Sequence, residues 1–233
     1  MTVHPRGVNH LAIATRDIKA QIDFFTNVLG CKLKALYWMH GAEGAWHAFL
    51  ELNPHSYVAF VRHPDNPGTL TWGLTHAGTP TGPVAAGALQ HVAFHLDSVE
   101  DLLALRDRIR SRGIMAIGPV DHGFCQSLYF GGPEGLALEL TTGEAIDDQA
   151  WIDPEVVELA GIARHELARY RDPAPYQRPE TPVPQPALDR GRPHLNFSDE
   201  IYEVLATATD EQVRAMLSDT TPPVTTPPAT PHT

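Results

Sequence analysis

The stretch GALQHVAFHLDSVEDLLALRD (residues 87–107) has the same plan as GVNHLAIATRDIKAQIDFFTNVLG (residues 7–30). Each begins with a strand pattern that carries a histidine, passes through an aspartate, and continues as an amphipathic helix. The two histidines, His10 and His91, stand 81 residues apart at equivalent positions. Three further strand patterns follow each stretch. The sequence therefore predicts a twofold repeat of a βαβββ module.

The first module spans about residues 7–63 and the second about 88–142. In the first, we expect a helix from Asp17 to Gly30 with the buried stripe Ile18, Ile22, Phe25 and Leu29, and strands over 32–38, 46–52 and 57–62. In the second, we expect a helix over 98–112 and strands near 114–117, 125–131 and 135–142. The predicted class is α+β, with paired βαβββ modules forming one cupped mixed sheet.

The remaining segments differ in composition from the modules. Residues 64–86 are rich in Gly, Pro and Thr and are predicted to form a long connection over the first module. We expect one domain over 5–143 and a helical, proline-rich C-terminal extension over 144–218. Within it, helices are predicted at 153–171 and 198–218, joined by a linker at 172–193. Residues 219–233 are predicted to be a disordered tail.

The composition narrows the class of function. The chain has 233 residues, 42% hydrophobic, and a formal net charge of −11, which argues against nucleic acid or a membrane surface as a partner. No apolar run reaches the roughly 18–20 residues of a membrane span, and the N-terminus lacks a signal-peptide pattern. The two cysteines, Cys31 and Cys125, exclude a cysteine-based zinc site. We expect a cytoplasmic protein.

Alternation along the strands points to one chemical site. If Leu11 and Ile13 face the helix of the first module, His10 faces the opposite side, and His91 does the same in the second module. In EGLALELTT (134–142), Leu138 faces the helix and Glu139 faces away from it. A carboxylate on such a face is costly unless it is paired or binds a cation. Two histidines and one carboxylate form a ligand set for Fe(II), which also suits Mn(II) and, less well, Zn(II).

Three segments then resemble the vicinal oxygen chelate superfamily: LQHVAFHLDSVEDLL, IGPVDHGFCQSLYF and GPEGLALEL. Within it, the second module most resembles type I extradiol (catechol 2,3-type) dioxygenases. The resemblance covers about residues 5–143. It implies that His10, His91 and Glu139 bind Fe(II), with Mn(II) as the other option.

The resemblance also implies catalytic roles for three further residues. Tyr129, ten residues before Glu139, matches the active-site tyrosine, and His122 in DHGF matches a histidine beside the substrate oxygens. His55 resembles the histidine that supplies acid–base chemistry near O2. The implied reaction inserts O2 into a catechol-like aromatic diol and opens the ring next to the diol. Trp38, His40, Trp46 and His47 are candidates for the pocket wall, and His95 shares the face of His91.

Two other classes of function stay open at this point. A glyoxalase-type isomerase or an epimerase shares the fold. The isomerase often has a fourth metal ligand, an acid on the last strand of the first module. In this chain the position equivalent to Glu139 is predicted to be Phe60, with no carboxylate nearby. A metal-free binding protein of the bleomycin-resistance type generally lacks the ligand set. Because the chain carries one module pair, we expect the C-terminal extension to cover the pocket or to join subunits of a homo-oligomer.

Overall fold

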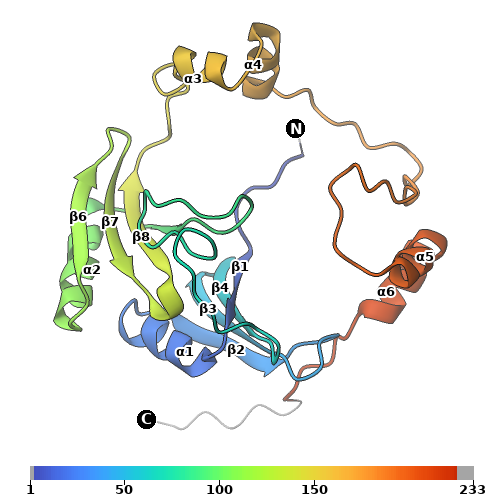
Figure 1. The fold of residues 1–233 in the computed structure, drawn as a ribbon, viewed down its shortest axis with the longest axis horizontal. Coiled ribbons are helices and arrows are strands. Elements are labelled where there is room, and N and C mark those ends of the chain that lie inside the picture. Colours follow the sequence, from blue (N-terminus) through green and yellow to red (C-terminus); the bar gives the residue numbers. More distant parts are fainter. Residues whose placement is uncertain (1–2, 225–233) are drawn as a thin grey trace. The chain divides into compact units, whose positions relative to one another are not determined.

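In the computed structural model, which describes residues 3–224, each repeat folds as a βαβββ module (Figure 1). Residues Pro5–Pro173 form one compact unit, and the described residues 3–4 and 174–224 form another. Module 1 contains β1 (His10–Thr15), α1 (Ile18–Asn27), β2 (Lys32–Trp38), β3 (Trp46–Asn53) and β4 (Ser56–Arg62). Module 2 contains β5 (Val92–His95), α2 (Val99–Ser111), β6 (Ala116–Asp121), β7 (Cys125–Gly131), the 3₁₀ turn η1 (Pro133–Gly135) and β8 (Ala137–Gly143).

The two sheets have the same topology. Their strand orders are β1-β4-β3-β2 and β5-β8-β7-β6, and the first strand of each module is an edge strand that runs parallel to the last. The α+β class and the paired modules are confirmed. The eight strands form two four-stranded sheets instead of one, and no strand pairing links the two sheets within the described residues.

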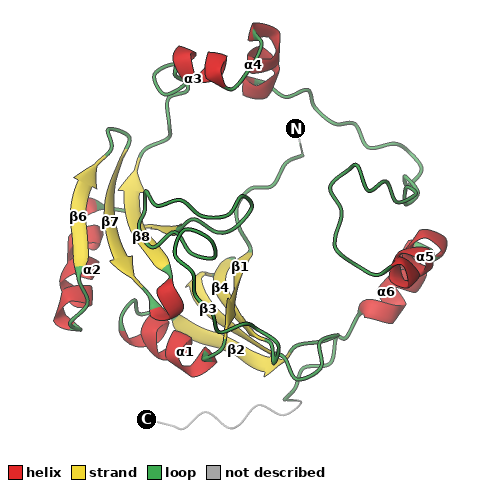
Figure 2. Cartoon of the chain, viewed as in Figure 1, coloured by secondary structure: helices red, strands yellow, loops and turns green. Residues whose placement is uncertain are grey.

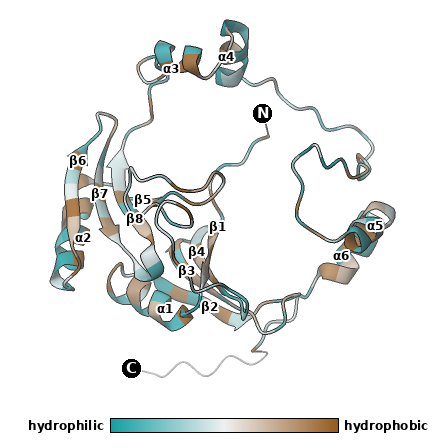
Figure 3. Ribbon diagram, viewed as in Figure 1, coloured by the Kyte–Doolittle hydropathy of each residue, from teal (hydrophilic) through white to brown (hydrophobic). Residues whose placement is uncertain are grey.

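Local signals explain why the helices begin where they do. The side chain of Asp17 accepts a hydrogen bond from the backbone of Ala20, and Ser98 accepts one from Asp101. Both are preferred N-cap residues, because they satisfy backbone donors that have no partner inside the helix. Hydrophobic and hydrophilic segments alternate along α1 (Figure 3), and Phe25 on its inner side is fully buried.

One hydrophobic core joins the two modules. The ring of Phe25 lies 5.1 Å from Phe60 in module 1 and 6.0 Å from Phe94 in module 2. Arg108 of α2 donates hydrogen bonds to the carbonyl oxygens of Thr26 and Asn27. Burying a phenylalanine contributes roughly 1.5–3 kcal/mol. The helices therefore occupy the shared interior, and the opposite face of each sheet is left for the site.

The structure corrects three details of the prediction. β6 extends to Asp121, past the predicted end at 117, because Pro119 is tolerated in an edge strand that has a register shift. β5 begins at Val92, so His91 directly precedes the strand. The helix expected over 153–171 is divided at Gly161, which has a positive φ of 69°.

The segments outside the modules contain little regular structure. Residues 64–86 connect β4 to β5 as loop and turn, with one isolated bridge between Trp72 and His76 (Figure 2). After β8, the first unit ends with α3 (Pro154–Leu159) and α4 (Arg164–Arg171). The second unit contains α5 (Asp199–Thr207) and α6 (Asp210–Leu217). Of the predicted tail, residues 225–233 lie outside the described residues.

Candidate functional site

A pair formed by a half-buried histidine and a buried carboxylate lies on the face of module 2 that points away from α2. The Glu139 Oε2 atom is 3.0 Å from His91 Nε2, and the Glu139 side chain is only 8% exposed. Within residues 3–224, the ion pair found for Glu139 is the one with His91. A buried carboxylate needs a cationic partner or strong donors, so this pair is a natural place for a cation. The structure thus brings together two of the three predicted metal ligands.

The side chain of Gln90 holds His91 in this orientation and is itself held by backbone carbonyl groups of the long connection. The Gln90 side-chain oxygen contacts His91 Nδ1, so Nε2 is the nitrogen that meets Glu139. The Gln90 amide nitrogen donates in turn to the carbonyl oxygens of Thr79, Pro80 and Gly82 at 3.2, 2.8 and 3.2 Å. Contacts of this kind fix the tautomer and orientation of metal-binding histidines. Sequence reasoning missed Gln90, because its partners lie in the long connection.

His10, the third predicted ligand, lies on the corresponding face of module 1. Its Nδ1 atom is 2.9 Å from Asn9 Oδ1, and its exposed ring packs near Phe49 and His47, with centroid distances of 5.4 and 6.3 Å. Across residues 3–224, no three His, Cys, Asp or Glu side chains form a cluster suited to a metal ion. His10 comes from a strand of the other sheet, and no strand pairing sets its distance from His91.

Tyr129 and His122 lie in the same cavity as Glu139. This cavity of about 440 Å³, here called the β7–β8 cavity, is lined by residues of β5, the β6–β7 turn, β7, β8 and the segment after β8. Tyr129 stands opposite Glu139 in the antiparallel ladder, and its hydroxyl is 2.8 Å from His122 Nε2. Burial raises the pKa of Tyr129, the Ser127 hydrogen bond opposes this, and the charge of Glu139 adds to the increase. The hydroxyl therefore stays protonated at neutral pH.

His55 occupies a different environment from the other predicted catalytic residues. It is exposed in the turn between β3 and β4, where its backbone N–H donates to Asn53 Oδ1 at 2.9 Å. It lines neither the β7–β8 cavity nor the second cavity described below. His95 does line the β7–β8 cavity, although its side chain is mostly exposed and lies 3.7 Å from Asp97.

The aromatic stretch of residues 36–49 divides between the two faces of the first sheet. His47 is buried with its ring near those of Tyr37 and Phe49, on the face of His10, and its Nε2 atom has no hydrogen-bond partner in the structure. Burial lowers the pKa of His47, and the neighbouring His10 lowers it further. Trp38 and Trp46 pack edge to face against each other, and alternation places Trp46 on the helix side with Ala48 and Leu50.

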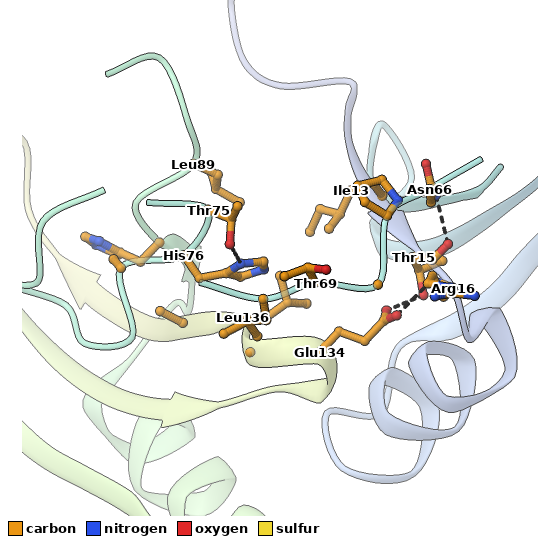
Figure 4. A pocket seen from close by; sticks show the side chains of 18 of the residues that line it. Ile13, Thr15, Arg16, Asn66, Thr69, Thr75, His76, Leu89, Glu134 and Leu136 are labelled. Carbon is orange, nitrogen blue, oxygen red and sulfur yellow. Dashed lines mark hydrogen bonds between the residues drawn. The ribbon is translucent and has the colours of Figure 1, made fainter. Parts of the chain in front are cut away.

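A second cavity of about 450 Å³, here called the loop cavity, lies where residues 66–77 meet both modules (Figure 4). His91 lines this loop cavity, whereas its partner Glu139 lines the β7–β8 cavity. At its edge, Glu134 reaches from η1 toward module 1 and accepts hydrogen bonds from the Arg16 backbone at 2.8 Å, from Gln21 Nε2 at 2.9 Å and from the Thr15 hydroxyl. Burial alone would raise the pKa of Glu134, but these hydrogen bonds together lower it. Sequence reasoning missed this link between the modules.

The strand register corrects the position that corresponds to Glu139 in module 1. Glu139 pairs with Ala93, two residues after His91, and the residue two after His10 is Ala12, which pairs with Ala59. The equivalent residue is therefore Ala59, and the expectation of Phe60 is wrong. Phe60 faces α1 and is fully buried. The conclusion that module 1 has no carboxylate at this position stands.

Comparisons with known proteins show which family and which relatives this chain resembles. The family described as "Glyoxalase/Bleomycin resistance protein/Dioxygenase superfamily" matches residues 7–140. Biphenyl-2,3-diol 1,2-dioxygenases 2 and 3 of Rhodococcus globerulus are each 30% identical over 141 residues, which is 60% of this chain and 64% of the relative. A glyoxalase/bleomycin resistance/dioxygenase domain from Frankia sp. EAN1pec has a TM-score of 0.49 at 20% identity, covering 60% of this chain and all of that one.

The family match spans more than half of the chain and contains both modules. Within residues 3–224, none of the helices is both long and apolar enough to cross a membrane. The chain belongs to the glyoxalase/bleomycin resistance protein/dioxygenase superfamily.

Proposed function

We propose that this protein is an extradiol dioxygenase that opens the ring of a small aromatic diol with O2. The observation that carries the proposal is the contact of His91 with the buried Glu139 carboxylate, beside the Tyr129–His122 hydrogen bond on one face of module 2. The 30% identity to two biphenyl-2,3-diol dioxygenases supports the same reaction class. In this reaction, the carbon–carbon bond next to the diol breaks, and both oxygen atoms of O2 enter the product.

The donor atoms of the pair suit a divalent metal. His91 and Glu139 supply an imidazole nitrogen and a carboxylate oxygen in contact with each other, and His10 would supply a second imidazole. Imidazole and carboxylate donors with open positions are typical of non-heme Fe(II), and Mn(II) accepts the same set. When bound, the metal would provide positions for the diol oxygens and for O2.

The chain's own side chains would prepare the diol. The Tyr129 hydroxyl, protonated at neutral pH, would hydrogen-bond a substrate oxygen at the wall of the β7–β8 cavity. His122, in contact with that hydroxyl, would hydrogen-bond a substrate oxygen beside it.

Anaerobic reconstitution tests the proposal. The full chain is loaded with Fe(II), biphenyl-2,3-diol or catechol is added, and O2 uptake is followed together with the yellow colour of a ring-opened product. We expect one O2 consumed per diol. His91→Ala should abolish both signals, whereas His63→Ala, a control at a histidine that lines neither cavity, should retain them. If several catechols and hydroquinones bind and none of them causes O2 uptake, the chain belongs instead among the binding proteins or non-oxidative enzymes of the family.

A further inference from the structure

The segment after β8 returns to the turn that carries His122. The backbone N–H of Glu144 donates to the carbonyl oxygen of Phe124 at 3.3 Å, and Ile146 lines the β7–β8 cavity together with Phe124. A few residues later, the Trp151 ring packs edge to face against Phe124, with centroids 4.8 Å apart. The first residues of the C-terminal extension thus form part of the wall of the candidate site.

The indole of Trp151 also lies against the backbone directly after His122. A Cβ atom placed on Gly123 would lie 2.8 Å from an indole carbon of Trp151, closer than real Cβ contacts allow. Gly123 also has a φ of 88°, where side chains other than hydrogen are strained. The sequence Asp-His-Gly-Phe therefore lets the indole lie against the turn at the position that neighbours His122.

Trp151 is itself held in place by a short hydrogen-bonded turn. The carbonyl oxygen of Asp147 accepts from the N–H groups of Ala150 and Trp151 at 3.1 and 3.0 Å, and its side chain accepts from Gln149 at 2.9 Å. Arg171, the last residue of α4, bonds Asp148 at 2.7 Å, and this hydrogen bond holds the pKa of Asp148 below its usual value. The indole nevertheless remains 50% exposed. Its contact area therefore lies mainly on the turn and contributes little to the central core.

We propose that Trp151 is a positioning residue, whose indole packs on Gly123 and Phe124 and thereby keeps His122 in hydrogen-bonding contact with Tyr129. The consequence for catalysis rests on the proposed function, but the geometry does not. Without the indole, the turn after β6 loses the side chain that packs on it, and the hydrogen bond between His122 and the Tyr129 hydroxyl breaks. A small displacement of a reacting group lowers a rate steeply, so we expect Trp151→Ala to reduce kcat about 10-fold with a smaller change in KM.

NMR of the full chain labelled with ¹⁵N-histidine tests the geometry without metal or substrate. The His122 signal is assigned by its loss in His122→Asn, and Tyr129→Phe gives its position without the hydrogen bond. We expect Trp151→Ala to move the signal most of the way to the Tyr129→Phe position, and Trp151→Phe to move it less. Trp38→Ala, which removes an exposed tryptophan of module 1, is the control and should leave the signal unchanged.

An unchanged His122 signal in a folded Trp151→Ala protein would overturn the proposal, and if that variant does not fold, the same result in Trp151→Phe would do so. In the reconstituted enzyme, Trp151→Ala should have no further effect on kcat in a His122→Asn background. An additional 10-fold loss there would show that Trp151 acts by another route. Absence of diol turnover in the wild-type chain would count against the proposed function alone, because the NMR result does not depend on turnover.

Discussion

Across β5, β8 and β7 of module 2, one row of facing residues reads Ala93, Glu139 and Tyr129, and across β1, β4 and β3 of module 1 the equivalent row reads Ala12, Ala59 and Phe49. The backbone topology is the same in both, and each row begins two residues after a histidine. Module 2 has a carboxylate and a phenol where module 1 has a methyl group and a phenyl ring. A duplicated fold can therefore keep its core and concentrate its polar chemistry in one copy.

The largest expected effect is on the free energy of unfolding, and it depends on which face of the sheet a residue of β4 occupies. Phe60→Glu places a charge in the core against α1, and we expect a loss of about 5 kcal/mol or more, enough to unfold the chain. Ala59→Glu places its carboxylate on the face of His10 and should cost distinctly less. Urea unfolding followed by circular dichroism measures both. Equal losses in the two variants would contradict the register that makes Ala59 the counterpart of Glu139.

The second expected effect is on Fe(II) affinity, which should depend on Glu139 of module 2 and not on Glu51 of module 1. Glu139→Ala should weaken Fe(II) binding at least ~100-fold, because even the groups that support metal ligands contribute roughly 10–100-fold to affinity. Glu51→Ala is a matched control, since Glu51 belongs to the first sheet and pairs with Lys34 at 3.6 Å. Anaerobic titration with Fe(II) measures the affinity. Comparable losses in both variants would show that the metal is not specific to the site in module 2.

A smaller effect is expected from the aromatic pair in these rows. Tyr129→Phe removes the hydrogen bond to His122, and a lost hydrogen bond of this kind should lower kcat about 10-fold. Phe49→Tyr adds a hydroxyl at the equivalent place in module 1 and should leave kcat unchanged. Steady-state O2 uptake gives both values. A Phe49→Tyr variant that is slowed as much would indicate that the substrate also contacts module 1.

The smallest effect concerns Glu134, which links the two modules. Because its folded-state pKa lies below the ordinary value of 4.5, the ionised carboxylate stabilises the fold above that value, and this contribution disappears as the pH falls through the lower folded-state pKa. Since Glu134 is exposed, we expect Glu134→Gln to cost less than ~1 kcal/mol at pH 7 and still less at pH 3. Urea midpoints of both proteins at the two pH values give the difference. A difference that does not vary with pH would exclude the carboxylate as its source.

Much of the fold was predictable because its signals are local. The N-caps Asp17 and Ser98, the terminating Gly30 and Gly113, and the apolar stripe of the first helix lie close to the elements they define. Alternation within a single strand also predicted that Glu139 faces away from Leu138 and Leu140, and the structure agrees, because Glu139 lines the β7–β8 cavity and both leucines belong to the core. Pairing between strands is a different kind of information, so counting along β4 pointed to Phe60 when the register selects Ala59.

The sequence by itself determined the repeat and its helices and strands. It also determined that a histidine, a glutamate and a tyrosine of the second module lie on one face of the sheet. Both follow because periodicity and capping act over a few residues. Tertiary structure alone decided which of these side chains meet. It joins His91 to Glu139, lets Gln90 tie His91 to the long connection, and sends Glu134 across to Thr15 and Arg16. It leaves His10 beside Phe49 and His47. The physical reason is that these contacts depend on how two sheets and their loops pack around a shared core, and residues up to 119 positions apart in the chain meet there.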